Sequence, residues 1–423
     1  MRSVILADDC NPEWPSLPVV GFKTARALAN HCDALVVTQI RNKPNLVKHG
    51  LGKADVMFID TEAIAAPIYK LSTRVRGGVA TAWTAAVAFT YPIYIAFETA
   101  VWRKLSRDIQ NGRFDVIHRL TPMSPTTPSP IASWSPIPFV LGPLNGGLPW
   151  PPRFKAEFQR EREWLSRVRS VHRVLPFYKS TYRNSAAILT AFEHTRIDLG
   201  PSAADRIINF PEVGVDPEQF APRTSNNQPC DRLTAIFVGR LVPYKLPEVV
   251  VRAFAEQPEL RKHRLVIVGD GPERPRLEAI VTEHGLEDCV ELVGWKTQDE
   301  VAELLRQSQV FLFPSIRELG AGVVVEAMAS GLPCVVVDYG APGALVGKDR
   351  GVAVPLADRD TLTREFGRAL HRLFEAPEQL REMGQRAQEH ALRYYSWDTK
   401  AKKLMDVYRW ASGEGSERPL FFS

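Results

Sequence analysis

LTAIFVGRL at residues 233–241 and RLVIVGDGP at residues 264–272 are the segments that decide the fold class. Each is a strand-length run of Val, Ile, Leu and Phe that ends in glycine and polar residues. Three similar runs follow: CVELVGW at 289–295, VFLFPS at 310–315 and PCVVVDYG at 333–340. Strands that are apolar on both faces are typical of a parallel sheet covered on both sides.

Helical patterns separate these strands, namely LPEVVVRAFAEQP, PRLEAIVTEHG and QDEVAELLRQS. Thr297 precedes the last of them and Glu300 lies three residues later, which predicts a capping box. VVVEAMAS (323–330) is predicted to be a short buried helix that stops at Ser330-Gly331. Strands alternating with helices indicate a doubly wound α/β domain.

The first half of the chain shows the same alternation less regularly. A helix, FKTARALAN at 22–30, lies between the first two of its predicted strands. Those strands are SVILA (3–7), ALVVTQI (34–40), DVMFID (55–60), FDVIH (114–118), FVLG (139–142) and AAILTA (186–191). Because 423 residues are too many for one typical core, we predict two Rossmann-like domains facing a central cleft.

The predicted boundaries follow composition and periodicity. The first domain covers 1–220, and the polar, aperiodic segment APRTSNNQPCDR at 221–232 is predicted to be a linker. The second domain covers 233–395, and a final helix covers 396–412.

Composition narrows the functional class. The net charge of +5 is only mildly basic and does not argue for nucleic acid. Five cysteines without a CxxC pair, and scattered histidines, argue against a disulfide framework or a metal site and favour a reducing compartment. MRSVILADD at the start lacks the pattern of a signal peptide, so we expect a cytoplasmic protein.

One uncharged stretch, Gly77 to Phe97, is long enough to ask whether it crosses a membrane. Threonines and Pro92 interrupt it, and it is only weakly apolar. A packed or interfacial helix is therefore favoured over a spanning one.

Polar residues gather where the strands of the second domain end. Gly239 and Arg240 follow one strand and Lys245 comes shortly after, and such cations can neutralise a diphosphate. The alternative is a pair of surface cations. Gly269 and Gly271 follow the next strand and permit close approach of a ligand. This is not a complete GxGxxG motif, which argues mildly against a nicotinamide enzyme.

RELGAGVVVEAMASG (317–331) holds two glutamates. Glu318 lies in the loop before the predicted helix, whose N-terminus favours an anion. Glu326 is expected two turns inside that helix. One carboxylate can then reach a ribose diol and the other a sugar, the layout of a nucleoside diphosphate sugar. Two solvated glutamates are the alternative, which fits Glu326 poorly because valines, alanine and methionine flank it.

Together these segments resemble the retaining glycosyltransferases of family 4, formerly group 1, which have the GT-B fold. The resemblance rests on the GRL…K segment (239–245), VGDGPER (268–274), VGW (293–295) and the two glutamates with EAMASGLPCVV (326–336). Looser matches are FDVIH, GPLNGG (142–147) and VGVDPEQF (213–220). The closing SWDTKAKKLMDVYRW looks like the family's last helix, which returns to the first domain.

The resemblance implies roles for these residues. Glu326 would bind the ribose hydroxyls, Glu318 would hold the transferred sugar, and Arg240 and Lys245 would stabilise the leaving diphosphate. His118 aligns with a histidine that contacts the donor sugar, although a strand-end histidine hydrogen-bonded locally is the alternative. The implied donor-binding residues are Gly21, Gly239, Gly269, Gly271, Pro272, Trp295, Gly320, Ala321, Gly322, Val323 and Glu326.

The resemblance further implies retention of anomeric configuration and no metal or other cofactor. The chain departs from the family pattern in three places. Ala321 replaces a usual glycine, Gly21 is the only glycine of the first-domain donor loop, and DYGAPGALV lacks a frequent glutamate. The donor is therefore ranked only by family habit, with a UDP-sugar first and a GDP-sugar second.

The resemblance implies that the first domain binds the acceptor. PRFKAEFQREREWLSRVRSVHRVLPFYKSTYR (152–183) carries nine Lys/Arg against three acids, with apolar residues at helical spacing. Such a basic amphipathic helix either binds an anionic membrane surface or packs its apolar stripe on the sheet. The predicted acceptor-side residues are Arg153, Lys155, Arg160, Arg167, Asn145, Gly146 and Gly147.

The predicted activity is transfer of a sugar from a nucleotide-sugar to a glycan or lipid-linked acceptor, in cell-envelope or exopolysaccharide biosynthesis. The protein is expected in the cytoplasm, where it could associate peripherally with the inner face of the membrane, and no nucleic acid partner is expected. Two alternatives stay open, a nucleotide-sugar epimerase of GT-B architecture and a non-catalytic sugar-nucleotide-binding protein.

Overall fold

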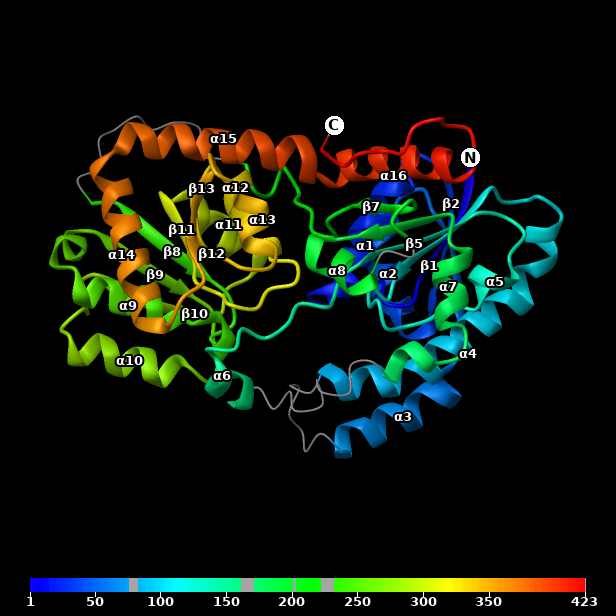
Figure 1. The fold of residues 1–423 in the computed structure, drawn as a ribbon, viewed down its shortest axis with the longest axis horizontal. Helices are drawn as coiled ribbons and strands as arrows, with labels where there is room; N and C mark the ends of the chain where they lie inside the picture. The colour runs from blue at the N-terminus through cyan, green and yellow to red at the C-terminus, as the bar shows by residue number, and fades with distance from the viewer. Residues whose placement is uncertain (76–82, 161–170, 201–202, 222–231, 423) are drawn as a thin grey trace. The chain divides into compact units, whose positions relative to one another are not determined.

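A computed structural model describes residues 1–75, 83–160, 171–200, 203–221 and 232–422. The chain divides into two compact units (Figure 1). Unit 1 comprises Met1–Gly147, Glu161–Glu212 and Trp397–Ser423, and unit 2 comprises Leu148–Arg160 and Val213–Ser396.

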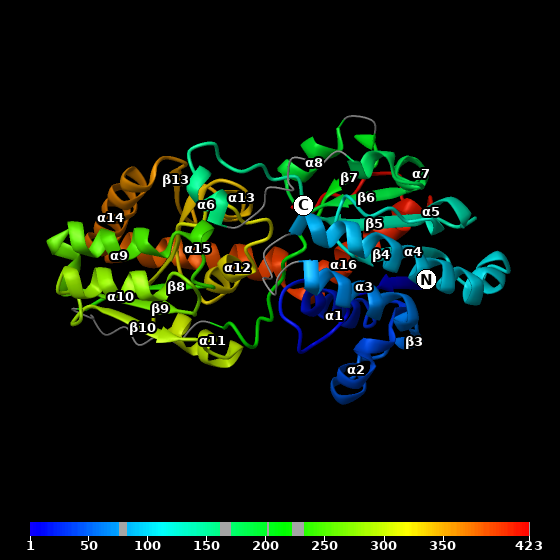
Figure 2. The same cartoon turned by 90° about the horizontal axis from the view of Figure 1, so that it is seen from below.

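Unit 1 is built on a seven-stranded parallel sheet in the order β3-β2-β1-β4-β5-β6-β7. Figures 1 and 2 show helices on both faces of it. Its elements are β1 (Arg2–Ala7), α1 (Leu17–Leu28), β2 (Asp33–Gln39), the 3-10 turn η1 (Ile40–Asn42), α2 (Lys43–His49), β3 (Asp55–Ile59), α3 (Glu62–Val75), α4 (Trp83–Gln110), β4 (Val116–Thr121), α5 (Ile131–Trp134), β5 (Phe139–Leu144), the 3-10 turn η3 (Val171–Val174), α7 (Tyr178–Asn184), β6 (Ala187–Thr190), α8 (Glu193–Leu199), β7 (Ile207–Asn209) and α16 (Trp397–Ala411).

The core of unit 1 explains the uncharged stretch that raised the question of a membrane. In α4, Phe97, Val101 and Leu105 recur every fourth residue and are fully or almost fully buried against the sheet. From Tyr91 onward the helix is therefore a packed one, and residues 76–82 lie outside the described part. No described helix is long and apolar enough to cross a membrane.

Unit 2 is built on a six-stranded parallel sheet in the order β10-β9-β8-β11-β12-β13. Its elements are α6 (Lys155–Arg160), β8 (Thr234–Val238), the 3-10 turn η5 (Pro243–Lys245), α9 (Pro247–Glu256), the 3-10 turn η6 (Pro258–Lys262), β9 (Arg264–Val268), α10 (Arg274–Glu283), β10 (Val290–Gly294), α11 (Gln298–Arg306), β11 (Val310–Phe313), α12 (Gly322–Ala329), β12 (Cys334–Asp338), α13 (Ala341–Val346), β13 (Gly351–Pro355), α14 (Arg359–Glu375) and α15 (Pro377–Tyr395).

The predicted fold class, two doubly wound parallel sheets, is confirmed. The capping box of α11 is also present, since the Thr297 hydroxyl accepts the Glu300 N–H and the Glu300 carboxylate accepts the Thr297 N–H at 2.8 Å. The last three helices fill the predicted helical tail. Two short edge strands, β7 and β13, were not predicted.

The chain enters unit 2 earlier than the predicted boundary at 220. Val213 and Val215 are buried in unit 2, and the Val215 N–H donates to the Tyr395 carbonyl at 2.9 Å. This pairing explains why VGVDPEQF belongs to the second unit. Of the predicted linker 221–232, residues 222–231 lie outside the described part of the chain.

The predicted helix over 152–183 is wrong as one continuous element. η3 replaces α-helix before Pro176, because proline lacks an N–H and disfavours helical backbone at the residue before it. Phe177 then adopts a left-handed conformation, with φ of 66°, as α7 begins. Arg167 lies within 161–170, outside the described residues.

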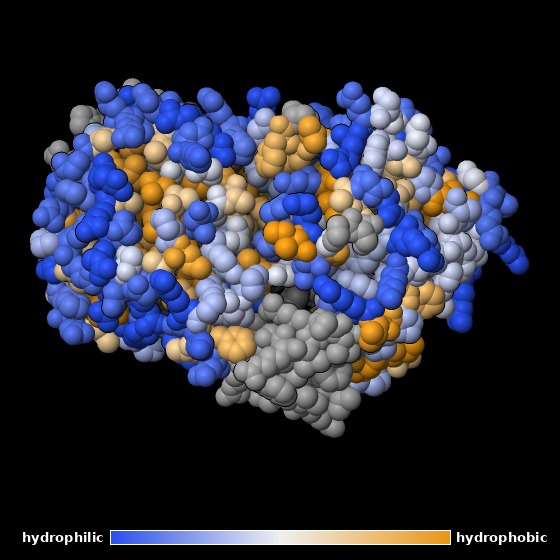
Figure 3. All heavy atoms as spheres, in the orientation of Figure 1, coloured by the Kyte–Doolittle hydropathy of each residue, from blue (hydrophilic) through white to orange (hydrophobic). Residues whose placement is uncertain are grey.

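The surface seen in Figure 3 is mostly hydrophilic, with hydrophobic residues in small separate groups. Scattered groups of this kind are normal for a folded domain, so only particular exposed side chains need an explanation.

Candidate active site

The carboxyl edge of the second sheet holds an ion pair between two of the predicted residues. Lys245 Nζ lies 2.7 Å from Glu318 Oε1, and both side chains are largely buried. Ser315 donates a further hydrogen bond of 3.3 Å to the same oxygen. Lys245 comes from η5 after β8 and Glu318 from the loop after β11, so adjacent strands bring them together.

The backbone of Glu318 is held as firmly as its side chain. Its carbonyl oxygen accepts the Ala341 N–H at 3.1 Å, and Gly340 lies so close that a Cβ there would fall 2.6 Å from that oxygen. Gly340 also has a left-handed φ of 67°. This loop therefore requires glycine at 340, and it fixes where the Glu318 carboxylate can lie.

Lys245 and Arg240 share a scaffold. Tyr244, between them, is tied through its carbonyl oxygen to the Ile316 N–H at 2.9 Å. The Lys245 ammonium also sits over the Phe313 ring, 4.8 Å from its centre. Arg240 is exposed and reaches the Tyr244 hydroxyl at 3.3 Å. Both cations thus stand at the strand ends where a diphosphate could meet them.

Gly239, Gly269 and Gly271 let two strand-end loops touch. A Cβ on Gly269 would lie 2.0 Å from the Gly239 carbonyl oxygen, and one on Gly271 would lie 2.4 Å from that of Leu241. Both have φ values, 133° and 153°, that side chains rarely adopt. The GDGP loop is thereby pressed against the loop that carries Arg240.

α12 begins beside Glu318. Gly320 and Ala321 precede it, and Gly322 and Val323 form its first turn, where backbone N–H groups have no acceptor within the helix. Ala321 is in the left-handed conformation, with φ of 54°. Glu326 lies one turn inside α12, four residues after its first residue Gly322, and not two turns inside as expected. The carboxylate is half-buried.

The two remaining donor candidates of unit 2 are solvent-exposed. Trp295, directly after the edge strand β10, is 67% exposed, and Pro272 is exposed as well. A large aromatic ring exposed at a strand end is free to stack on a flat ligand group.

His118 is fully buried in the middle of β4, not at the strand end as predicted. Its Nδ1 lies 2.6 Å from the Tyr408 hydroxyl and its Nε2 lies 2.5 Å from the Gly142 carbonyl oxygen. Burial lowers the pKa of His118 to about 4, so the ring is neutral at pH 7. Both ring nitrogens have hydrogen-bond partners inside unit 1, as expected for the alternative role of His118 as a locally hydrogen-bonded histidine.

Asn145, Gly146 and Gly147 lie at the carboxyl edge of the first sheet. The Asn145 amide donates to the buried Glu212 carboxylate, and the Gly146 N–H donates to Thr195 at 3.2 Å. Burial raises the pKa of Glu212 to about 7. Asn145 and Gly146 are thus hydrogen-bonded to other residues of unit 1.

Three of the predicted acceptor-side cations, in α6 and just before it, belong to unit 2. Arg153, Lys155 and Arg160 precede the return of the chain to unit 1. Arg160 pairs with Glu273, and the neighbouring Glu157 pairs with Arg359. Their assignment to the first domain is corrected accordingly.

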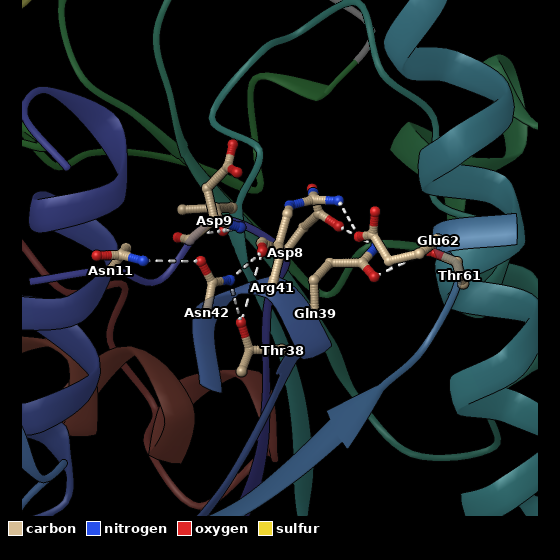
Figure 4. A network of polar contacts seen from close by, with 10 residues as sticks. Asp8, Asp9, Asn11, Thr38, Gln39, Arg41, Asn42, Thr61 and Glu62 are labelled. Carbon is tan, nitrogen blue, oxygen red and sulfur yellow. Dashed lines mark hydrogen bonds and ion pairs between the residues drawn. The ribbon is translucent and has the colours of Figure 1, made fainter. Parts of the chain in front are cut away.

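Asp8, at the end of β1, was not predicted and lies in a dense polar network (Figure 4). Gln39 donates to one carboxylate oxygen at 2.7 Å and Arg41 to the other at 3.2 Å. Arg41 also reaches Glu62 at 3.4 Å, and Asn42 donates to the Asp8 carbonyl at 2.9 Å. No sequence signal could have found this network, because its partners come from separate loops.

Asp9 differs from Asp8 although it follows it directly. Its backbone is held by Thr121, which accepts the Asp9 N–H at 3.1 Å and donates to the Asp9 carbonyl at 3.0 Å. Gly21 packs against the same carbonyl, 2.4 Å from where its Cβ would be. The carboxyl group points away from the network in Figure 4. Burial, and then the Asp8 charge, raise the pKa of Asp9 to about 7.

The place of Asp9 in the sheet is informative. β1 and β4 are neighbours, and the strand order reverses between them. Ligands of doubly wound sheets bind outside the carboxyl ends of the strands at such a reversal. Asp9 and Thr121 follow or end these two strands, so this edge is the candidate acceptor site of unit 1.

Comparison with known proteins finds a family match for part of the chain. Residues 219–390 match the model of glycosyl transferases group 1. A D-inositol 3-phosphate glycosyltransferase of Streptomyces bingchenggensis is 33% identical over 46% of this chain and 46% of its own length. One from Saccharomonospora viridis is 32% identical over 49% of this chain and 51% of its own. The chain thus spans about half the length of the curated relatives it matches.

Solved structures share the fold over nearly the whole chain. Sucrose-phosphate synthase from Thermosynechococcus elongatus has a TM-score of 0.64 at 18% identity, covering 98% of this chain and 100% of that one. An Anabaena protein in complex with UDP and glucose has a TM-score of 0.60 at 15% identity, covering 96% and 99%. The fold is that of the GT-B glycosyltransferases, as predicted.

Proposed function

We propose that this chain, whose residues 219–390 form a glycosyl transferases group 1 domain on a GT-B fold, transfers a sugar from a nucleoside diphosphate sugar to a glycan or lipid-linked acceptor. The observation that carries the proposal is the Lys245–Glu318 pair at the carboxyl edge of the second sheet, with Arg240 and the start of α12 beside it. A UDP-sugar is the first candidate donor and a GDP-sugar the second.

The proposed role of these residues is to stabilise negative charge on the leaving diphosphate. Transfer breaks the bond between the anomeric carbon and the diphosphate and forms one to an acceptor hydroxyl oxygen, so negative charge accumulates on the diphosphate. Lys245 and Arg240 are placed to offset that charge, as are the free N–H groups of the first turn of α12. No metal is required by this scheme, and we propose that the reaction proceeds with retention.

The ion pair suggests an order of events. Glu318 and Lys245 pair with each other at 2.7 Å. A diphosphate would compete with the Glu318 carboxylate for Lys245. Donor binding would then release the carboxylate to accept hydrogen bonds from the sugar hydroxyls, while Glu326, one turn into α12, would take the ribose hydroxyls.

The acceptor is assigned to the carboxyl edge of unit 1. Asp9 presents a carboxyl group there and Thr121 fixes its backbone. A carboxylate accepts hydrogen bonds from hydroxyl groups but repels phosphate. We therefore place an uncharged polyol face of the acceptor at Asp9. The proposed setting is the inner face of the cytoplasmic membrane, in cell-envelope or exopolysaccharide biosynthesis.

The retained site residues favour transfer over the two alternatives. A nucleotide-sugar epimerase would not need the full pair Glu318 and Glu326, and a non-catalytic binder would not need the pair that holds Lys245 against Glu318.

The test is nucleotide release from UDP- and GDP-sugars in the presence of a glycan and lipid acceptor panel. Glu318→Ala is expected to lower kcat at least about 100-fold, because it removes a contact to the reacting sugar, while nucleotide still binds. Glu389→Ala on α15, an exposed glutamate, is the matched control. Unchanged transfer in Glu318→Ala would remove the assignment of that residue.

A further inference from the structure

The turn η3 and the start of α7 expose apolar side chains beside cations. Val174 is 81% exposed and Phe177 is 38% exposed. Both line an open depression of about 490 Å³ together with Lys179 and Arg183. Among the described residues, neither of these two cations has a side-chain hydrogen bond or ion pair. Exposed apolar side chains beside cations that have no partner within the described fold are groups that another molecule could use.

The Phe177 side chain is supported from beneath by aromatic rings. The Phe177 ring meets the Trp134 ring edge-on at 5.8 Å, and Trp134 lies 6.0 Å from Trp102. Trp134 and Trp102 pack against the core of unit 1. Phe177 is thereby held outward on a rigid base, in its left-handed backbone conformation.

Topology places this corner at a particular edge. α7 lies on the crossover from β5 to β6, which are parallel neighbours. Such a crossover starts from the carboxyl edge of the sheet and returns to the amino edge. η3 and the first turn of α7 therefore lie toward the edge where Asp9 and Thr121 end their strands.

We propose that the η3–α7 corner, defined as Arg173, Val174, Phe177, Lys179 and Arg183, docks unit 1 on an anionic lipid bilayer. Val174 and Phe177 would enter the headgroup region, and Lys179 and Arg183 would meet lipid phosphates. Arg173 contributes less, because it is also 3.7 Å from Asp198. This inference rests on the proposed function, because docking would bring a lipid-linked acceptor to the carboxyl edge of unit 1.

A bilayer fits this corner better than a protein partner. A stable protein interface covers about 800 Å² on each side with a packed apolar centre. Two exposed apolar side chains cannot supply that centre, whereas shallow insertion needs only a few. Because only two apolar side chains insert, we expect binding to be weak. Salt should weaken it further, because it screens the cations from the lipid phosphates.

Vesicle flotation with the full chain tests the proposal. The vesicles are phosphatidylglycerol–phosphatidylcholine mixtures or phosphatidylcholine alone, at low salt. Val174→Asp is compared with Val47→Asp, because Val47 is 71% exposed in the same unit. Lys179→Glu is compared with Lys53→Glu, an exposed lysine before β3 at the far end of the sheet order.

The expected result is flotation of the wild type with anionic vesicles only. Lys179→Glu should lower the partition coefficient at least about fivefold, the factor expected for one lost cation at such a surface. Val174→Asp should also lower it, because it removes an inserted apolar side chain and adds a negative charge, while both controls bind as the wild type does. Equal loss in a variant and its control, or no flotation at low salt, would overturn the proposal. Nucleotide titration of the same preparations shows separately whether the donor site works.

Discussion

At the scale of single residues, Ala321 is where local conformation and sequence disagree most. It is an alanine in left-handed backbone, with φ of 54°, directly before the helix that faces the donor. A Cβ in that region costs about 1 kcal/mol relative to glycine. Such strain is tolerated when the surroundings hold it, and here the loop from Glu318 and the start of α12 do so.

Ala321→Gly is therefore expected to stabilise unit 2 by about 0.5–1 kcal/mol, because glycine adopts this conformation without the Cβ contact. Urea unfolding measures the shift in the midpoint. Ala279→Gly on the exposed side of α10 should have the opposite sign, since glycine weakens a helix interior. A destabilised Ala321→Gly would contradict the backbone assignment.

Asp9 predicts how stability depends on pH. Its pKa is raised from 3.8 to about 7 by burial and by Asp8, so the folded state keeps a proton that the unfolded state has lost. The contribution of Asp9 to the free energy of unfolding is fully present below pH 4 and is lost as the pH rises to about 7. Asp9→Asn should match the wild type at pH 4 and exceed its stability by about 1–3 kcal/mol at pH 7.5.

Thermal unfolding of both proteins at a series of pH values checks this. Parallel profiles for wild type and Asp9→Asn would mean that Asp9 ionises normally. The same substitution should also weaken the acceptor, since an amide replaces the carboxylate that accepts its hydroxyls.

At the scale of elements, sequence patterns predicted the strands well and the connections poorly. Apolar runs such as VIV before Gly269 mark a buried strand without help from the rest of the chain. β7 has only three residues and β13 is an edge strand with few large apolar residues, so neither stood out. The basic segment 152–183 misled because its apolar residues keep a helical spacing up to Leu175, although Pro176 directly after them disfavours a continuous helix.

The residues of the candidate site also fall into those that the sequence could predict and those that it could not. Lys245 and Glu318 follow strands whose ends were visible in the sequence, so their neighbourhood was predictable, although their ion pair was not. The Asp8 network was not predictable, because Arg41 and Glu62 belong to other loops and no local spacing links them to Asp8.

The contact between the Gly239 loop and the GDG loop (269–271) makes an element-scale prediction. Gly269→Ala should lower the unfolding temperature of unit 2 by several degrees, because its Cβ would fall 2.0 Å from the Gly239 carbonyl oxygen. Gly285→Ala is the matched control, since Gly285 has φ of 60° but nothing within 4 Å of a Cβ. Equal losses in the two variants would show that the close approach is absent.

At the scale of the whole molecule, each unit is a complete doubly wound sheet, and chain segments from distant positions complete unit 1. α16 returns to it after the second unit, where Lys400 donates to the Pro211 carbonyl beside Glu212. Burial lowers the pKa of Lys400 to about 7, and Glu212 in turn holds Asn145. The chain leaves unit 1 after residues 147 and 212 and re-enters it at 397. Contacts within unit 1 thus link residues close to all three of these points.

The central claim is that the carboxyl edge of the second sheet binds a nucleoside diphosphate. Calorimetric titration of the wild type with UDP and with GDP tests it most directly, with Glu326→Ala and the control Glu389→Ala alongside. We expect one nucleotide to bind, its affinity to fall at least about tenfold in Glu326→Ala through loss of a charged hydrogen bond to the ribose, and the control to bind as the wild type does. Binding of neither nucleotide, or equal binding by Glu326→Ala and wild type, would contradict the account.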